Sequence, residues 1–311
     1  MNIIKNRYLY FLISLLVIIP GLIFLIINWT QTGKPLPLGI DFTGGSLLEV
    51  QFTGTRPPAS DVQAAFTKFA ADTTPIIQAL GNDSFAIRSR AIDDATKGEI
   101  VAEFESLSGS PVTVLAFSSV SAAVGAEVTK AAGFAILLAA GAILAYIWYA
   151  FRGLDHAIRY GTAAVLAMLH DVLVVLGVEA ILAYFLGWEA DALFLTALLT
   201  VIGFSVHDTI VVFDRIRENS HVYRRVEYET LVNHSIVQTL DRSINTQLTV
   251  MFTLLALVLF GGESIRHFVI ILLVGIFSGT YSSIFNASPI LVVWENREWK
   301  NWFGRTNQAQ A

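Results

Sequence analysis

Six long apolar stretches constrain this chain more than any other feature of its sequence. A transmembrane helix needs about 20 mostly apolar residues to cross a hydrocarbon layer roughly 30 Å thick. The sequence meets that requirement at residues 9–27, 132–150, 161–185, 192–213, 241–260 and 268–294. Of its residues 54% are hydrophobic and 14% are charged, whereas soluble domains have roughly 25% charged residues. We therefore expect an integral membrane protein built on an all-α bundle of six transmembrane helices.

The positive charges of the loops predict how these segments are oriented. On one side of the bundle, the two short turns 187–191 and 261–267 contain a single Lys or Arg residue, Arg266. The other loops and the two ends, all on the opposite side of the bundle, contain Lys5, Arg7, Arg152, Arg159, Arg215, Arg217, Arg224, Arg225, Arg297, Lys300 and Arg305. Loops rich in Lys and Arg stay in the cytoplasm, so both termini are expected there. The first apolar segment is too long for a signal peptide and no small-residue cleavage site follows it, so we interpret it as an uncleaved anchor.

Residues 31–130 have the composition of a soluble domain, and the predicted topology places them outside the cytoplasm. Alternating or β-branched runs predict strands at 46–52, 75–80, 84–90 and 112–118, and amphipathic patterns predict helices at 59–71 and 93–107. The order βαββαβ is that of a ferredoxin-like α+β domain. The predicted division is a cytoplasmic start and first helix (1–30), the extracytoplasmic domain (31–130), helices two to six (131–295) and a cytoplasmic tail (296–311).

Several classes of chemistry are excluded by residues or motifs that the sequence lacks. Without any cysteine, the chain has no disulfide, thiolate nucleophile or Cys-ligated metal. It contains no GxxxxGK[ST], HExxH or GxSxG motif, the usual signatures of nucleotide binding and of two hydrolase classes. No basic tract interleaved with aromatic residues indicates nucleic acid. We therefore expect no cofactor, no metal and no enzymatic activity, and an ion gradient as the remaining energy source.

Ionisable side chains within the predicted spans are the candidate functional residues. Each costs about 2.5 to 3.5 kcal/mol or more to insert at the centre of a bilayer, so such residues persist where they pair or line a pathway. A rise of about 1.5 Å per residue places Asp208 roughly 9 Å inside the membrane, a depth that Arg242 can match. We predict that Asp208 carries a proton and that Arg242 is its switchable partner. The predicted relay comprises Asp208, Arg242, Asp171, His207 and His170.

Two spans also have polar or small residues along one helical face. The stripe on the fifth span contains Gln238, Arg242, Asn245, Thr249 and Thr253, with Thr246 beside it. The stripe on the fourth span contains Thr196, Thr200, Gly203 and His207. Spacings of three and four put the members of each stripe on one side of a helix. Because such faces are not expected to contact lipid, we predict that the two stripes face each other.

Each of these residues also has a purely structural interpretation. Asp208 and Arg242 can form a static ion pair that sets helix register, and Asp171 can be satisfied by a neighbouring helix. The two histidines can be hydrogen-bonded packing residues. Glu179 is expected near the outer interface with a solvated carboxylate. Gly275, Gly279 and Ser283 predict a packing surface for another helix, either in this chain or in a partner, and Gly203 is also predicted to pack against a helix.

Four sequence motifs resemble those of the SecD/SecF family. The first is GIDFTGG, which includes Gly39, Asp41, Phe42, Gly44 and Gly45. The others are LHDV at 169–172, GFSVHDTIVVFDRIREN at 203–219 and GTYSSIF at 279–285. The resemblance covers nearly the whole chain, and the single small external domain favours the SecF members. In the fifth span Ser243 and Val250 replace family threonines, and Asp241 is a second candidate partner for Arg242.

The resemblance implies a fold, a location, partners and a task. The fold is half of a transporter of the resistance-nodulation-division type, in the bacterial inner membrane, with SecD supplying the other half. The implied partners are SecD, the SecYEG channel, YajC and the exported unfolded polypeptide. The implied task is to use the proton motive force to promote protein export as an accessory to the Sec translocase, without covalent chemistry.

Two functions from other classes remain as alternatives. One is a stand-alone exporter of a small molecule or lipid, which would require a roomy apolar cavity in the external domain. The other is an intramembrane aspartyl protease using Asp171 and Asp208 as a dyad that shares a proton. No GxGD motif flanks either aspartate.

Overall fold

The computed structural model describes residues 2–70, 75–152 and 157–298 and divides them into two compact units. One unit comprises Pro37–Ala135 and Glu189–Ala192, and we call it the insert domain. The other described residues form the helical unit. The short turn 189–192 is thus far in sequence from the rest of the insert domain to which it belongs.

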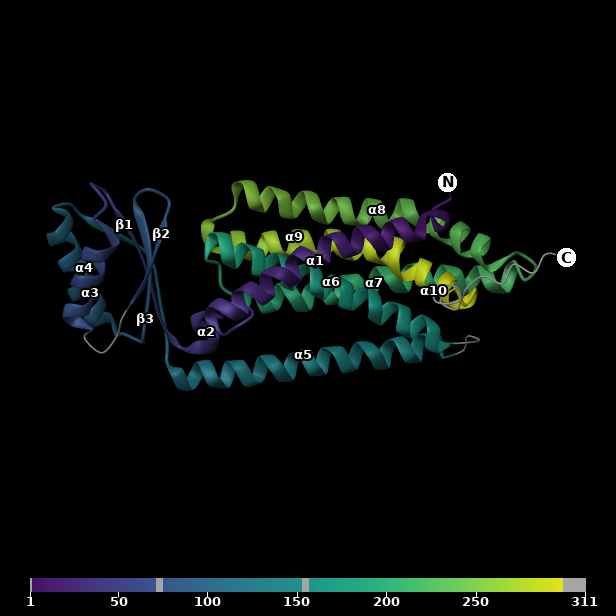
Figure 1. Cartoon of the computed structure of the whole chain (residues 1–311), viewed down its shortest axis with the longest axis horizontal. Coiled ribbons are helices and arrows are strands. Elements are labelled where there is room, and N and C mark those ends of the chain that lie inside the picture. Colours follow the sequence, from purple (N-terminus) through teal and green to yellow (C-terminus); the bar gives the residue numbers. More distant parts are fainter. Residues whose placement is uncertain (1, 71–74, 153–156, 299–311) are drawn as a thin grey trace. The chain divides into compact units, whose positions relative to one another are not determined.

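The predicted six apolar helices are confirmed within the described residues, where six helices are long and apolar enough to cross a membrane. They are labelled in Figure 1. Their bounds are α1 (Arg7–Thr32), α5 (Ala122–Phe151), α6 (Ala157–Leu186), α7 (Ala192–Val222), α8 (Tyr228–Phe260) and a last span made of α9 (Glu263–Ser282), a π-helical turn η2 (Ser283–Ala287) and α10 (Ser288–Glu295). A 3-10 turn, η1 (Ile4–Asn6), precedes α1.

Three helices extend well past the predicted spans: α5 at its start, α7 at its end and α8 at its start. The predicted ends at residues 213 and 241 mark only where the apolar runs stop, whereas α7 continues to Val222 and α8 begins at Tyr228. The two polar extensions are joined by side chains, because Asn219 donates a hydrogen bond to Ser235 at 2.8 Å. A search for apolar runs detects the part of a helix that crosses the hydrocarbon layer and misses a polar continuation beyond it.

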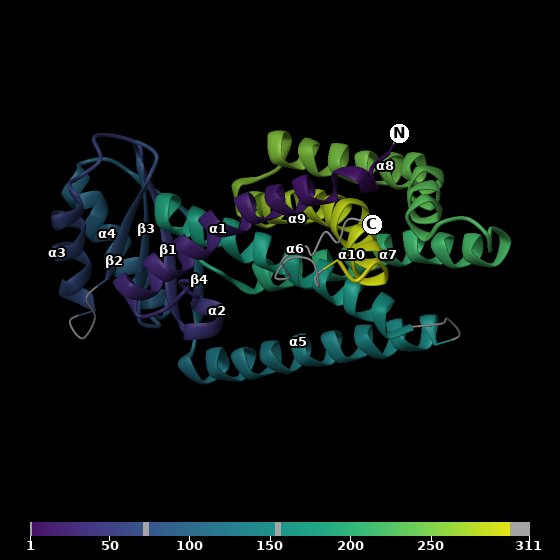
Figure 2. The ribbon, with the colours of Figure 1, turned by 45° about the vertical axis from the view of Figure 1, so that its right-hand side comes forward.

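The insert domain is a four-stranded antiparallel sheet with strand order β2-β3-β1-β4. Both helices α3 and α4 lie on one face of it (Figure 2). The predicted order of strands and helices is observed: β1 (Gly45–Phe52), α3 (Ala59–Phe69), β2 (Ile76–Leu80), β3 (Ser84–Ser89), α4 (Asp94–Ser108) and β4 (Val112–Val120), preceded by the one-turn helix α2 (Ile40–Thr43). The core between sheet and helices contains Phe52, Phe66 and Phe104, all at most 2% exposed.

Glycines allow close helix contacts inside the helical unit. A Cβ added to Gly275 of α9 would lie 2.1 Å from Val201 Cγ2 of α7, and one added to Gly279 would lie 3.3 Å from the Cα of Ser205. The stripe of Gly275, Gly279 and Ser283 therefore packs within this chain, with the two glycines against α7 and Ser283 fully buried in η2. The sequence had left open whether the stripe packs within the chain or on a partner.

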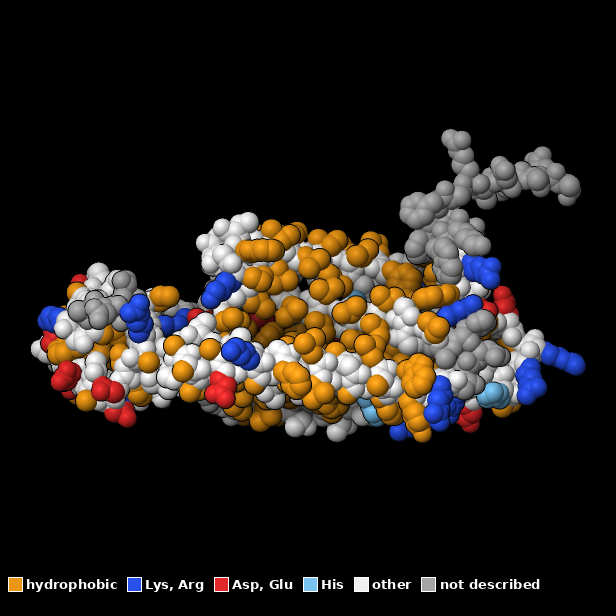
Figure 3. Space-filling view, turned by 90° about the horizontal axis from the view of Figure 1, so that it is seen from below, with side chains coloured by type: hydrophobic (Ala, Val, Ile, Leu, Met, Phe, Trp, Pro, Cys, Tyr) orange, Lys and Arg blue, Asp and Glu red, His pale blue; other side chains and the backbone are white. Residues whose placement is uncertain are grey.

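Both ends of the described chain lie towards the same end of the helical unit, which we call the terminal end (Figure 1). Arg7 at the start of α1 pairs with Glu298, just past α10, at 2.7 Å. Asn233 of α8 accepts a hydrogen bond from the backbone N–H of Ile3 at 2.7 Å. On the face shown in Figure 3, hydrophobic side chains cover the middle of the helices and charged side chains gather towards the helix ends. This is the distribution expected of a surface in contact with lipid.

Candidate functional site

Two carboxylates are buried in the middle of adjacent spans. Asp171 of α6 is 0% exposed and Asp208 of α7 is 5% exposed. A buried carboxylate requires hydrogen bonds or a counter-charge to replace its lost hydration. The groups that surround each aspartate therefore indicate what each can do.

Three serine hydroxyls from two neighbouring helices donate hydrogen bonds to Asp171. Ser205 of α7 and Ser282 of α9 donate to Oδ2 at 2.5 and 2.6 Å, and Ser278 of α9 donates to Oδ1 at 2.6 Å. The Nδ1 atom of His170 lies 2.9 Å from Oδ1. Each carboxylate oxygen thus has two partners, which is the structural arrangement considered for Asp171 in the sequence. The serines that provide it went unnoticed there because nothing in their local pattern indicates that they point at one residue.

His170 connects this cluster to α1. Its ring stacks on Tyr281 with the ring centres 6.2 Å apart, and the Tyr281 hydroxyl donates to the backbone oxygen of Tyr10 at 2.7 Å. The Nε2 atom of His170 is buried without a hydrogen-bond partner among the described residues.

Asp208 has fewer partners than Asp171. The side-chain amide of Gln247 in α8 donates a hydrogen bond to Oδ2, and His207 Nδ1 lies 3.8 Å from Oδ1. The amide oxygen of Gln247, Oε1, is buried and has no partner within the described part of the chain. Gln247 was not among the predicted site residues, although it follows Ser235, Thr239 and Ser243 at intervals of four on the buried side of α8.

The predicted pairing of Asp208 with Arg242 is absent from the contacts of the described residues. Arg242 is exposed, as is Asp241 beside it. Five residues separate Arg242 from Gln247, and at about 100° per residue the two side chains point to different sides of α8. The predicted polar stripe does lie on one face of α8. A second stripe of α8, Ser235, Thr239, Ser243 and Gln247, is the one that faces Asp208.

The two polar stripes predicted to face each other are both on the surface of the helical unit. On α8 the exposed members are Gln238, Arg242, Asn245, Thr246, Thr249 and Thr253. On α7, Thr196 and Gly203 are exposed and the His207 side chain is 69% exposed. Gln238 accepts hydrogen bonds from Arg215 at 2.7 Å and Asn219 at 2.9 Å. We call these exposed residues of α7 and α8 the polar face, and groups of this kind are not left against hydrocarbon.

Gly203 and Glu179 differ from their expected environments. Gly203 was predicted to pack against another helix, but a Cβ built on it meets no described atom within 4 Å. Glu179 was expected to be solvated, yet it is 0% exposed and its Oε2 lies 2.7 Å from His267 Nε2 of α9. Trp188 packs on the His267 ring with centres 4.5 Å apart. The end of α6 is covered by the start of α9, a tertiary contact that hydropathy does not predict.

The GIDFTGG motif lies in the insert domain and contacts two distant parts of the chain. Gly44 and Gly45 have φ of 72° and 126°, conformations that favour glycine. The backbone oxygen of Phe42 accepts a hydrogen bond from Thr129 of α5 at 3.0 Å. The carboxylate of Asp41 accepts a hydrogen bond from the backbone N–H of Ala192, the first residue of α7, at 2.9 Å. The sequence connected this motif to a family without assigning it a structural role.

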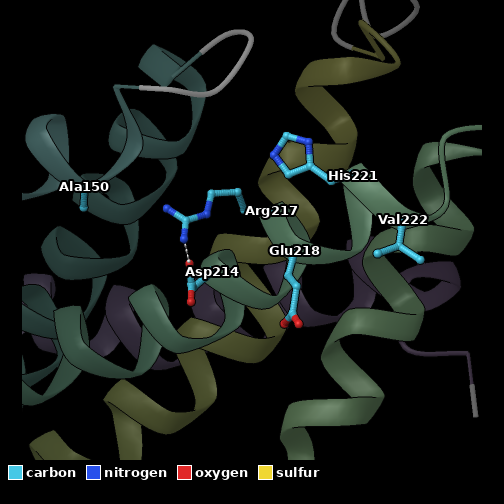
Figure 4. A pocket seen from close by; sticks show the side chains of 6 residues that line it. All are labelled: Ala150, Asp214, Arg217, Glu218, His221 and Val222. Atoms are coloured by element: carbon cyan, nitrogen blue, oxygen red, sulfur yellow. Dashed lines mark ion pairs between the residues drawn. The ribbon is translucent and has the colours of Figure 1, made fainter.

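A hollow of about 560 Å3 opens at the terminal end of the helical unit (Figure 4). Its lining residues are Ala150, Asp214, Arg217, Glu218, His221 and Val222. Arg217 is paired with Asp214 at 2.7 Å, and Glu218 is paired with Arg215 of the same helix. None of the predicted site residues lines it, and we assign it no part in the site.

The fold and the site together define a class of protein. Six apolar spans, a small α+β insert and ionisable groups concentrated inside the helices define a multi-pass membrane protein with an intramembrane polar site.

Comparison with known proteins identifies the family. The family model for the protein export membrane protein SecD/SecF, C-terminal, matches residues 100–297, and the SecD/SecF GG motif model matches residues 31–55. The chain belongs to the SecD/SecF family. It is 53% identical over 306 residues to the protein translocase subunit SecF of Anaerolinea thermophila, covering 98% of this chain and 97% of that one. It is 47% identical to the SecF subunit of Thermobaculum terrenum, covering 100% of this chain and 99% of that one.

A solved structure agrees with this family. A crystal structure of SecDF, a translocon-associated membrane protein from Thermus thermophilus, matches with a TM-score of 0.77 and 32% identity. The match covers 96% of this chain and 39% of that chain. Family membership on the SecF side makes this chain a protein translocase subunit with a role in protein export.

Proposed function

We propose that this chain is one half of a two-part complex that uses the proton motive force to promote protein export. A SecD-type subunit is the other half, and the complex is an accessory of the Sec translocase. The observation that carries the proposal is the polar face of α7 and α8 next to the buried carboxylate of Asp208. No covalent chemistry is required of the chain.

The polar face supports a second helical half. Leaving the Arg242 guanidinium and the other polar groups against lipid would cost several kcal/mol, since each central charge costs about 2.5 to 3.5 kcal/mol or more. A partner helix with a complementary carboxylate would remove that cost. The similarity to SecDF covers nearly all of this chain but 39% of the larger one. We propose that the remainder of such a chain corresponds to the SecD half, in a resistance-nodulation-division-type arrangement.

The loop charges support an orientation for this complex. The terminal end carries most of the Lys and Arg of the loops, so it is placed in the cytoplasm. The insert domain then lies outside the inner membrane, where it meets the exported polypeptide. Its strand order and the placement of both helices on one face support a ferredoxin-like fold. SecYEG and YajC are the proposed neighbours of the complex.

Asp208 is the proposed proton carrier because its environment accommodates two protonation states. When ionised, it accepts a hydrogen bond from the Gln247 amide. When protonated, one of its oxygens becomes a donor, and the unpartnered Oε1 of Gln247 accepts from it after a half-turn of the amide group. The orientation of the Gln247 amide in α8 thereby depends on whether Asp208 in α7 is protonated. Asp171, with both oxygens already occupied, positions α6, α7 and α9, and His170 and His207 flank the two carboxylates.

The proposal is tested with Asp208→Asn in the complex with its SecD-type partner, reconstituted with the translocase in energised vesicles. The amide removes the titratable group and keeps the side-chain shape. We expect normal assembly, normal ATP-dependent export and loss of the export increment that depends on the proton gradient. Asp214→Asn is the matched control, because Asp214 is on the same helix but is exposed and pairs with Arg217.

Two results would contradict the assignment. If Asp208→Asn still exported in proportion to the gradient, Asp208 would not be the carrier. If Asp208→Asn failed to assemble while Asp214→Asn assembled normally, Asp208 would have a structural role and not that of a proton carrier.

The structure does not favour the protease alternative. An aspartyl dyad shares one proton between its two carboxylates. Instead, the four partners of Asp171 occupy both of its oxygens, and none of them is Asp208.

A further inference from the structure

The turn between α6 and α7 is held by the insert domain. Leu38 and Ala190 form a parallel β-bridge, in which the Gly39 N–H donates to the Ala190 oxygen at 2.8 Å and the Ala190 N–H donates to the Pro37 oxygen at 2.9 Å. Both hydrogen bonds join backbone atoms. The five residues that connect two spans, 187–191, therefore include a short strand-like segment paired with the motif that follows α1.

The first residue of α7 is fixed by the same motif. Asp41 Oδ2 accepts the Ala192 N–H at 2.9 Å, and this N–H is one of the four at the start of a helix that have no partner within the helix. The negative charge of Asp41 also lies at the positive end of the helix dipole. Asp41 thus caps the N-terminus of α7, although it lies 151 residues before Ala192 in the sequence.

An ion pair adds a third attachment. Arg88 of β3 and Glu189 lie 3.0 Å apart, with side chains 20% and 21% exposed. Burial raises the pKa of Glu189, and the positive charge of Arg88 opposes that rise. Arg88 is itself oriented by Gln78 of β2, which accepts a hydrogen bond from it at 3.1 Å. The sheet of the insert domain is therefore connected directly to the turn.

From these contacts we infer that Asp41, the Leu38–Ala190 bridge and the Arg88–Glu189 pair form a permanent clamp within the insert domain, which fixes residues 189–192 and so positions the start of α7. The inference rests on the proposed function, because α7 carries Asp208. From Ala192 to Asp208 the helix spans 16 residues, or about 24 Å, without an interruption. The clamp thereby positions the N-terminal end of the helix that carries Asp208. Asp41 is a positioning residue in this scheme.

The test compares three variants in the same reconstituted complex. Asp41→Ala removes the cap, whereas Asp41→Asn keeps an oxygen that can accept the Ala192 N–H. Asp93→Ala is the matched control, because Asp93 caps α4 of the same domain by accepting the Thr96 N–H at 2.9 Å. We expect Asp41→Ala to assemble and still conduct protons, with gradient-driven export reduced about fivefold or more. Asp41→Asn and Asp93→Ala should retain most of that export.

A cross-link tests whether the clamp is permanent. The chain has no cysteine, so Leu38→Cys with Ala190→Cys introduces a single pair. Bridge partners lie about 5 Å apart, which suits a disulfide. We expect the oxidised pair to keep gradient-driven export. Loss of export on oxidation with recovery on reduction would overturn the inference, because the clamp would then have to open during each cycle.

Hydrogen exchange separates failure of the clamp from failure of the proposed function. Asp41→Ala should raise the exchange rate of the Ala192 amide about fivefold, with no such change in Asp41→Asn. If the native complex showed no gradient-dependent export, the proposed function would fail while this measurement would still test the contact. If Asp41→Ala changed neither exchange nor export, or abolished proton conduction together with export, the clamp would be rejected.

Discussion

Asp171 and Asp208 are carboxylates on successive spans, both buried, yet their surroundings differ in kind. Asp171 has two partners on each oxygen, drawn from α6, α7 and α9. Among the described residues, Asp208 has one hydrogen bond, from an amide whose own oxygen has no partner there, and it lies next to the exposed His207. Burial alone therefore does not distinguish a structural carboxylate from a functional one. The roles proposed above for the two carboxylates rest instead on the number of groups around each.

Packing also differs between the two sides of α7. The α9 glycines contact α7 on the side that contains Ser205, a partner of Asp171. On the other side of α7, Gly203 has open space around it and His207 is 69% exposed. The side of α7 that faces α9 is a closed core, and the side with Gly203 and His207 is next to a surface that we expect a partner to cover. Three predictions test this comparison.

The largest effect is expected from Asp171→Ala. Removing this carboxylate leaves three buried serine hydroxyls without their acceptor, and losses of this kind cost about 3 to 5 kcal/mol. We expect a sharp fall in folded yield and melting temperature of the purified chain in detergent. Asp208→Asn, measured in parallel, should stay within about 1 kcal/mol of the native chain. Equal stability losses in the two variants would remove the distinction between the two sites.

An intermediate effect is expected from Gly275→Ala. Its new Cβ would lie 2.1 Å from Val201 Cγ2, so α7 or α9 must move, at a cost of about 1 to 3 kcal/mol. Gly203→Ala is the control, because its Cβ meets no described atom and alanine favours a helix by up to about 1 kcal/mol. Thermal unfolding of both variants in detergent measures the difference. A Gly203→Ala chain as unstable as Gly275→Ala would show that the side of α7 with Gly203 and His207 is also closely packed.

The smallest effect on the chain alone is expected from Arg242→Ala. Arg242 is exposed, so its removal should change the stability of the isolated chain by no more than about 0.5 kcal/mol. Recovery of the SecD-type partner by affinity purification should fall, because the partner loses its cationic contact. Arg215→Ala serves as control, since Arg215 bonds to Gln238 and Glu218 within this chain. Undiminished recovery with Arg242→Ala would move the interface elsewhere.

Much of this protein was predictable from local sequence pattern. The length of each apolar run determines that it spans a membrane, and an alternating or helical period determines the order of strands and helices in the insert domain. Both are properties of a segment and its solvent, so they can be read without knowing the neighbours. The motifs likewise indicated the family, and the cost of burying charge identified Asp171 and Asp208 as candidates.

The tertiary structure decided which face of each helix looks inward. Periodicity places Arg242 and Gln247 on different sides of α8 but does not say which side meets α7, because that depends on the helices packed around it. For the same reason the burial of Glu179 under α9, the convergence of three serines on Asp171 and the contact of Asp41 with α7 were not predictable. Each joins residues that are far apart in the chain, and their proximity arises only when the helices and the insert domain have folded.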